Sequence, residues 1–187
     1  MDSFENICQL INEKLKQKQP LFVAIDGRCA SGKTTLAKKL QAHFSCPVIA
    51  MDDFFLQPQQ RTEERLAQPG GNVDRERFFQ EVLKPLKEKQ EACYRPYDCQ
   101  SQSFLPAIAV EKSDLYLVEG SYACHPEIAT EYDLKLFLTT TVEKQLARLE
   151  KRNPQKLKQF QERWIPLEES YFSAYPIEKA ADLVVTT

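Results

Sequence analysis

A short apolar segment that runs into a glycine-containing loop constrains this chain more than any other feature. Residues 21–26 read LFVAID, an unbroken apolar run ending in an acid, which is typical of a strand buried on both faces of a parallel sheet. Residues 27–34 read GRCASGKT and match the GxxxxGKT pattern in full, and Leu36, Leu40 and Phe44 then recur with helical spacing. A strand, such a loop and a helix in that order predict a phosphate-binding unit, because the loop N–H groups and the helix N-terminus both favour an anion.

The loop predicts a nucleotide site that uses ATP and Mg²⁺. Lys33 is expected to bridge the β- and γ-phosphates, and Thr34 is expected to ligate the metal. The sequence has no NKxD motif of the kind GTPases use to read guanine, but this leaves the choice between ATP and GTP open. The predicted nucleotide contacts are Gly27, Arg28, Cys29, Ala30, Ser31, Gly32, Lys33, Thr34 and Thr35.

Strand-like and helix-like segments alternate along the chain. A first helix begins near residue 4, with Asp2 or Ser3 as its cap. The alternation predicts an α/β chain with the three-layer P-loop NTPase fold and a mainly parallel five-stranded sheet. With 187 residues, the chain is predicted to form a single domain, 1–187. The further strands are expected at 47–54, 115–120, 133–139 and 181–187.

Two segments interrupt this alternation. Residues 56–112 or so form a predicted insertion that would bind a second, small-molecule ligand, called the acceptor below. The insertion is expected to contain a polar, mobile loop at 56–71, a helix capped by Asp74 or Asn72, and a hairpin or irregular piece at 93–112. Residues 143–158 or so form a predicted short lid, and Pro166 is expected to kink the helix that follows it.

Composition narrows the classes of partner. Lys plus Arg total 25 and Asp plus Glu total 27, and the resulting net charge of −2 argues against a nucleic-acid binder. No apolar run is long enough to span a bilayer, and no signal peptide is visible. The six cysteines form no metal-binding or disulfide pattern, which indicates reduced thiols and a cytoplasmic location. We therefore expect a small-molecule partner, while homo-oligomerisation stays open.

Acidic residues follow two of the predicted strands. Asp52 and Asp53 come at the end of the second strand, and Glu119 ends the third. Ligands of open α/β sheets bind outside the carboxyl ends of the strands, so these acids are expected near the phosphate loop. Phosphoryl transfer needs a metal ligand and a group that takes the proton of the attacking hydroxyl. Glu119, with Thr34, is the candidate metal ligand and Asp52 the candidate base, although aspartates at this position also serve as ordinary turn residues.

These elements together resemble the uridine kinase, nicotinamide riboside kinase and phosphoribulokinase group. The resemblance covers residues 20–187 or so and includes the less common element Asp-Asp-Phe-Phe at 52–55. It implies an ATP-dependent phosphotransferase with an alcohol group as acceptor. The motifs that carry it are DG at 26–27, SGKTT at 31–35, MDDFF at 51–55, VEG at 118–120, Arg148 with Arg152-Asn153, and the ADLVV run at 181–185.

The resemblance also assigns an acceptor pocket. Asp52 matches the acid that activates the acceptor hydroxyl, and Asp53 stands beside it. Asp74 resembles the aspartate that binds sugar hydroxyls, with helix capping as the alternative role. Tyr97 and Asp98 resemble the tyrosine-containing hairpin that lines the nucleoside pocket. The chain continues CQSQ at 99–102, where uridine kinases use a histidine near the base, so an acceptor other than uridine stays open.

Basic residues fall on the predicted lid and in the insertion. Arg148 and Arg152 are four residues apart on one helix face and could reach the transferring phosphate together. The RxR pair of many uridine kinases is replaced by PQKLK at 154–158. Arg61 and Arg65 could meet an anionic acceptor, or could be solvated charges.

Three functions are consistent with these residues. The leading one is a kinase of a nucleoside-like acceptor, with Asp52 as base and with Lys33, Arg148 and Arg152 stabilising charge. A second is a kinase of another metabolite, such as pantothenate or a sugar phosphate. A third is a P-loop ATP-binding regulatory protein, which would bind and slowly hydrolyse ATP without responding to any small alcohol.

Overall fold

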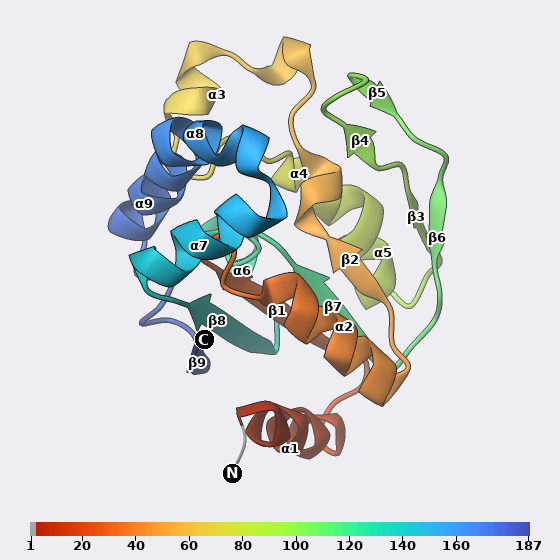
Figure 1. Ribbon diagram of the computed structural model, residues 1–187. Helices are drawn as coiled ribbons and strands as arrows, with labels where there is room; N and C mark the ends of the chain where they lie inside the picture. Colours follow the sequence, from red (N-terminus) through yellow and green to blue (C-terminus); the bar gives the residue numbers. More distant parts are fainter. Residues whose placement is uncertain (1–2) are drawn as a thin grey trace.

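A five-stranded parallel sheet forms the centre of the computed structural model, which describes residues 3–187 (Figure 1). The strand order is β2-β7-β1-β8-β9, and every neighbouring pair is parallel. The predicted α/β class and five-stranded sheet are therefore confirmed. Asp2, one of the two expected caps of the first helix, lies outside the described residues. The strands are β1 (Leu21–Gly27), β2 (Val48–Ala50), β7 (Leu115–Glu119), β8 (Leu134–Thr139) and β9 (Leu183–Thr186).

Helices cover both faces of the sheet and give the expected three layers. Alternate residues of β1 point to opposite faces: Val23 and Ile25 pack with α1 (Ser3–Leu15) and α2 (Lys33–Phe44), whereas Phe22 and Ala24 pack into the other core. That second core takes in the helices α4 (Arg75–Phe78), α5 (Lys84–Lys87), α6 (Pro126–Ala129) and α9 (Ile165–Ala174). Among the described residues, no helix combines the length and apolar character needed to cross a bilayer.

The second strand is shorter than the sequence predicts. It ends at Ala50, and Met51–Phe54 is a 3-10 helix, η1, rather than strand. Met51 and Phe54 are three residues apart and fully buried, so a helix with three residues per turn places both in the core. The turn leaves Asp52 on the open side of the sheet edge.

The insertion contains more regular structure than its composition suggests. Two short antiparallel ladders form the expected hairpin region: β3 (Ala92–Tyr94) with β6 (Ile108–Val110), and β4 (Tyr97–Asp98) with β5 (Ser103–Phe104). The segment expected to be a polar loop contains a 3-10 turn, η2 (Pro58–Gln60), and a helix, α3 (Glu63–Ala67). Thr62 caps α3 by accepting a hydrogen bond from the Arg65 N–H.

A long helical run leads from the lid back to the sheet. The helix α7 (Val142–Arg152) is capped by Thr141, whose hydroxyl accepts a hydrogen bond from the Lys144 N–H. After Asn153 come η4 (Pro154–Lys156), α8 (Leu157–Gln159), the π-turn η5 (Phe160–Trp164) and α9. A similar π-turn, η3 (Phe79–Leu83), links α4 to α5. Each π-turn comes just before a proline, Pro166 or Pro85, whose ring would clash with the carbonyl four residues earlier in a regular helix. The expected kink at Pro166 thus takes the form of a widened turn.

Candidate active site

The phosphate loop lies between β1 and α2, as its sequence predicts. Gly27 has φ of +134°, and a Cβ there would overlap the Leu138 carbonyl oxygen of β8. Only glycine therefore allows the loop to leave the sheet so close to the neighbouring strand. The Asp26 carboxylate is fully buried and accepts hydrogen bonds from the N–H groups of Gly27 (2.6 Å) and Cys124 (2.9 Å).

The side chains of the loop are held for contact with an anion. The Lys33 ammonium donates to the carbonyl oxygens of Gly27 (2.7 Å) and Arg28 (2.9 Å). The Ser31 hydroxyl is fully buried and has no hydrogen-bond partner among the described residues, so it is available to a phosphate oxygen. Burial raises the pKa of the Cys29 thiol to about 12, which keeps it protonated.

Two of the acids expected at strand ends lie beside the loop. The Thr34 hydroxyl donates to Glu119, whose two oxygens lie 3.1 and 3.3 Å away. Burial raises the pKa of the Glu119 carboxyl, and the Asp52 charge raises it further.

Gly120 follows Glu119 with φ of +141°, and a Cβ there would lie 2.9 Å from that of Met51. The glycine therefore lets η1, which carries Asp52, pack against the end of β7.

The side chain of Asp52 lines a cavity beside the phosphate loop. Its side chain is reached by solvent through the cavity, yet protein on several sides raises the pKa of its carboxyl by desolvation. Lys33 and Arg152 act in the opposite direction and lower that pKa. The result is a carboxylate that faces the ammonium of the phosphate loop and keeps a raised proton affinity.

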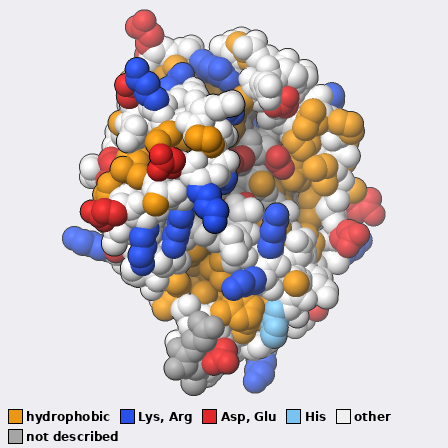
Figure 2. All heavy atoms as spheres, viewed as in Figure 1, with side chains coloured by type: hydrophobic (Ala, Val, Ile, Leu, Met, Phe, Trp, Pro, Cys, Tyr) orange, Lys and Arg blue, Asp and Glu red, His pale blue; other side chains and the backbone are white. Residues whose placement is uncertain are grey.

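The cavity has a volume of about 710 Å³ and extends to both sides of the loop. Figure 2 looks into the hollow, with acidic side chains inside it and Lys and Arg side chains on its rim. At one end, α1, α2 and β9 supply Phe4, Ile7, Lys39 and Val185. The other end, which we call the acceptor end, is lined by Asp52, Phe55, Asn72, Ser121, Tyr122, Phe160, Trp164 and Glu168.

Most of the predicted nucleotide contacts line this cavity. They are Cys29, Ala30, Ser31, Gly32, Lys33, Thr34 and Thr35. Gly27 and Arg28 lie outside the lining, and the Arg28 guanidinium forms an ion pair with Glu169.

Four predicted substrate residues do not line it. Asp74 caps α4 by accepting from the Arg77 N–H and also accepts from the Gln60 amide. Asp98 accepts from its own turn, including the Ser101 hydroxyl at 2.6 Å. Asp53 accepts from the Tyr94 hydroxyl at 2.9 Å, and Tyr97 is buried against Phe104. Contact of these four residues with the acceptor stays a prediction.

The two lid arginines occupy different positions. Both line the cavity, but Arg148 donates to the Ala30 carbonyl (3.1 Å) and to the Thr187 hydroxyl (2.8 Å). The Arg152 guanidinium lies 5.8 Å from the centre of the Phe160 ring and acts on the Asp52 carboxyl. Arg152 is therefore the arginine that acts on the candidate base Asp52, whereas Arg148 binds the backbone of the phosphate loop at Ala30.

The arginines of the insertion are engaged elsewhere. Arg65 pairs with both carboxylate oxygens of Glu76, at 2.6 and 2.7 Å, and donates to two backbone carbonyls. Arg61 donates to the Leu56 carbonyl at 3.0 Å and lies beside Cys99. Neither lines the cavity, so the geometry gives no support to their contact with an anionic acceptor.

Several lining residues were missed by sequence reasoning. Ser121 and Tyr122 directly follow Glu119-Gly120, so their position after a strand end was a usable signal. Phe160, Trp164 and Glu168 recur every four residues, which marks one helix face. Glu168 in particular had no local motif to distinguish it from a surface acid.

The residues present fit a magnesium ion. Mg²⁺ prefers oxygen ligands and in kinases takes one or two protein groups, with phosphates and water completing its shell. Thr34 and Glu119 supply a hydroxyl and a carboxylate within hydrogen-bond distance of each other. Within residues 3–187 no group of three or more metal-binding side chains is found.

Comparison with known proteins agrees with this geometry. No family model matches the chain. Uridine kinases from Ureaplasma parvum serovar 3 and Ureaplasma urealyticum serovar 10 are each 27% identical to it over 147 residues, 72% of this chain and 69% of theirs.

Solved structures show the same fold. A candidate fructose transport system kinase from Silicibacter sp. TM1040 aligns with a TM-score of 0.72 and 23% identity, over 99% of this chain and 100% of that one. A candidate uridine kinase from Bacillus stearothermophilus aligns with a TM-score of 0.66 and 20% identity, over 96% and 98% of the two chains. The chain is therefore similar in sequence to uridine kinases, and it shares the fold of the two solved structures.

Proposed function

We propose that this chain transfers the γ-phosphoryl group of ATP to a hydroxyl of a small, uncharged, nucleoside-like acceptor. The observation that carries the proposal is that Asp52 shares one cavity with Lys33 and with the Thr34–Glu119 pair. A base, a phosphate-binding cation and a metal-binding pair are the parts that phosphoryl transfer requires.

The residues divide the chemistry among them. The acceptor oxygen attacks the γ-phosphorus, a new O–P bond forms, and the bond to the bridging oxygen of the ADP leaving group breaks. Asp52 takes the hydroxyl proton, for which its raised pKa makes it a stronger base than an ordinary carboxylate. Lys33, the loop N–H groups and Arg152 stabilise the charge on the transferred group. Thr34 and Glu119 would hold Mg²⁺, which neutralises phosphate charge when bound.

The acceptor end of the cavity favours an uncharged molecule. Asp52 and Glu168 place two carboxylates there, with Phe55, Phe160 and Trp164 as aromatic surface. Arg61 and Arg65 are engaged elsewhere. We assign Lys33 and Arg152, the cations beside Asp52, to the transferred phosphoryl group. A phosphate or carboxylate on the acceptor would therefore lack a cation of its own. A sugar phosphate and pantothenate are therefore weaker candidates than a neutral molecule with hydroxyl groups and a flat ring. We place this activity in the cytoplasm, where ATP is found.

An acceptor screen tests both parts of the proposal. ADP release is measured with ATP and Mg²⁺ across nucleosides, sugar phosphates and pantothenate. We expect stimulation by an uncharged nucleoside-like alcohol, and a loss of about 10²–10⁴-fold in Asp52→Asn, with nucleotide binding by calorimetry retained. Retained turnover in Asp52→Asn would remove Asp52 from the mechanism. Nucleotide binding with slow hydrolysis and no response to any alcohol would indicate a regulatory protein instead.

A further inference from the structure

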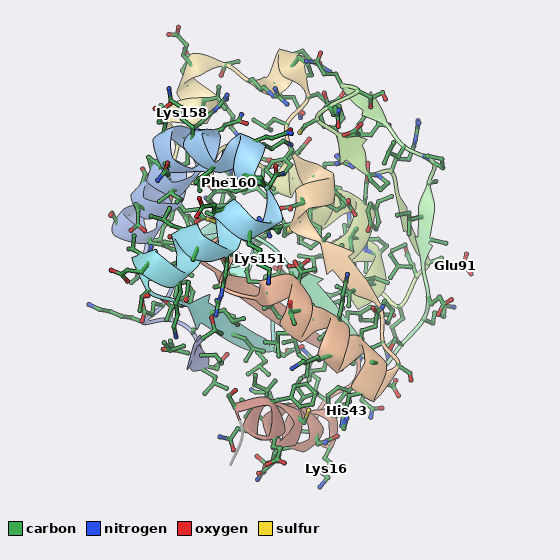
Figure 3. All side chains as sticks on the ribbon, viewed as in Figure 1. Lys16, His43, Glu91, Lys151, Lys158 and Phe160 are labelled. Carbon is green, nitrogen blue, oxygen red and sulfur yellow. The ribbon has the colours of Figure 1, made fainter. Side chains whose placement is uncertain are left out.

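One face of the helix after the lid runs along the cavity and ends at the phosphate loop. Phe160, Trp164 and Glu168 lie on this face and all line the cavity. Phe160, labelled in Figure 3, lies between this helix and α7, and its ring is 4.4 Å from that of Trp164. The helical segments from η4 to α9 follow one another without a break, so the aromatic residues and Glu168 lie on one continuous helical run.

Glu168 connects this helix to two parts of the active site at once. One carboxylate oxygen accepts a hydrogen bond from the Cys29 N–H of the phosphate loop at 2.9 Å. The other accepts from the Ser121 hydroxyl, which follows the Glu119-Gly120 strand end, also at 2.9 Å. Only 3% of the residue is exposed. Both oxygens are thus already engaged by protein donors, which suits a residue that fixes the site rather than one that binds the acceptor.

The next turn of α9 strengthens the same connection. Glu169 pairs with Arg28, and the Arg28 guanidinium lies 5.3 Å from the centre of the Phe172 ring. The Tyr171 hydroxyl donates to Asp26 at 3.0 Å. Successive residues of α9 therefore hold the first part of the phosphate loop, from the end of β1 to Cys29.

We propose that Glu168 is a positioning residue, a latch that connects the helical run from η4 to α9 to the phosphate loop, so that nucleotide binding and the position of this helical run are coupled. The inference rests on the proposed ATP-dependent function. The same helical run carries Trp164 and, through Glu168, holds the Cys29 N–H. A movement of the phosphate loop at Cys29 is therefore expected to move Trp164, and a movement of Trp164 is expected to move the loop. By linkage, whatever orders the phosphate loop also favours the docked position of this helical run, and that position strengthens nucleotide binding to the same degree.

Trp164 makes the coupling directly observable. It is the one tryptophan in the sequence, so intrinsic fluorescence reports its surroundings alone. In the wild-type protein we expect ADP with Mg²⁺ to change the Trp164 emission and ATP to show an ordinary KM. In Glu168→Ala we expect the emission change to shrink several-fold and the KM for ATP to rise about ten-fold, the effect of losing one protein hydrogen bond.

Two further variants separate positioning from general damage. Glu168→Gln should recover most of both signals, because its amide oxygen can accept from the Cys29 N–H and its amide nitrogen can donate to Ser121. Glu162→Ala is the matched control: Glu162 lies on the same helix, in an exposed pair with Lys158, and its loss should change neither signal. Should Glu168→Ala not fold, Ser121→Ala removes one of the two contacts and should give a partial loss.

The outcomes distinguish the latch from the proposed function. An emission change and KM equal to wild type in Glu168→Ala, or in Ser121→Ala where that variant stands in, would overturn the latch. A Glu168→Gln variant as defective as Glu168→Ala would also overturn the proposed latch, because the effect of Glu168 on nucleotide binding would then depend on its charge and not on its two hydrogen bonds. If the wild-type protein itself gives no binding heat and no emission change with nucleotide, the proposed function fails together with the coupling.

Discussion

Asp52 is held between two opposing influences on its proton affinity. Desolvation raises the pKa of its carboxyl, whereas the positive charges of Lys33 and Arg152 lower it. A base must be ionised to work, so turnover should fall as the pH drops through a pKa above the ordinary carboxyl range. The balance between the two influences sets where that fall occurs.

Replacing Arg152 should therefore move the acid limb of the pH profile. Arg152→Gln removes one lowering charge, so the pKa of Asp52 rises and the acid limb of kcat/KM moves to higher pH. Arg148→Gln is the comparison, since Arg148 braces the Ala30 carbonyl and should lower the rate without moving the limb. An acid limb at the same pH in wild type and Arg152→Gln would show that Arg152 does not act on the base.

At the residue scale, sequence reasoning located the acids at the strand ends, whereas the roles it gave to the acids of the insertion stay predictions. Asp52 and Glu119 were predictable because each follows an apolar strand, and strand ends of a parallel sheet meet beside the loop. Asp74 and Asp98 were also singled out, yet each accepts hydrogen bonds from its own turn. Caps and ligands use the same residue types, so local sequence could not separate them.

Arg77 ties the hairpin insertion to the edge of the sheet. Its guanidinium donates to the backbone carbonyls of Asp53 (2.8 Å) and Arg95 (3.0 Å). The same group lies 4.3 Å from the ring centre of Phe54 and 5.2 Å from that of Phe104. One side chain therefore connects η1, the hairpin and α4.

Arg77→Ala should loosen the hairpin selectively. Two backbone carbonyls lose their donor, and the local stability of residues 92–110 should fall by about 2 kcal/mol. Hydrogen exchange measured by mass spectrometry should then show faster exchange in 92–110 than in the central strands. Lys84→Ala, at an exposed position of the same helical run, should leave the pattern unchanged. Equal acceleration across the whole sheet would contradict this account.

At the element scale, periodic segments were predictable and interrupted ones were not. The strands β1 and β7 correspond to unbroken apolar runs, and the run of β8 is interrupted only by Lys135. The helices at 58–67 were missed because their polar sequence lacks an apolar stripe, and their stability comes from Arg65 bound to Glu76 and to loop carbonyls. A proline within a helical pattern predicts an interruption, as at Pro166, but the pattern does not reveal that the interruptions before Pro85 and Pro166 take the form of π-turns.

The whole molecule should be stabilised by its nucleotide. A ligand that binds only the folded state at 100 times its Kd adds about 2.7 kcal/mol. For a chain of this size each kcal/mol shifts Tm by about 2–4 °C, so ADP with Mg²⁺ should raise Tm by about 5–10 °C. Lys33→Ala should lose most of that shift in a thermal-shift assay, since Lys33 lies at the phosphate loop. The same shift in both proteins would place the nucleotide elsewhere.

The order of the strands in the sheet could not be derived from the chain alone. Alternating strands and helices predict a parallel sheet, but β1 lies between β7 and β8, which follow it by more than 85 residues. Which strand neighbours which depends on how the crossovers pack, and that is a property of the assembled core.

That strand order has a consequence for how the protein acquires its site. The phosphate loop is made early, at residues 27–34, but its partners come late: Glu119 is 85 residues from Thr34, Glu168 is 139 from Cys29, and Thr187 is 156 from Ser31. Contacts of such long sequence separation form slowly, because the intervening chain must first be closed. During synthesis, a nascent chain that has emerged only through α7 holds the complete GRCASGKT motif and no working site. The protein should therefore become able to bind nucleotide only when the five-stranded sheet is complete, and not when the GRCASGKT segment has been synthesised.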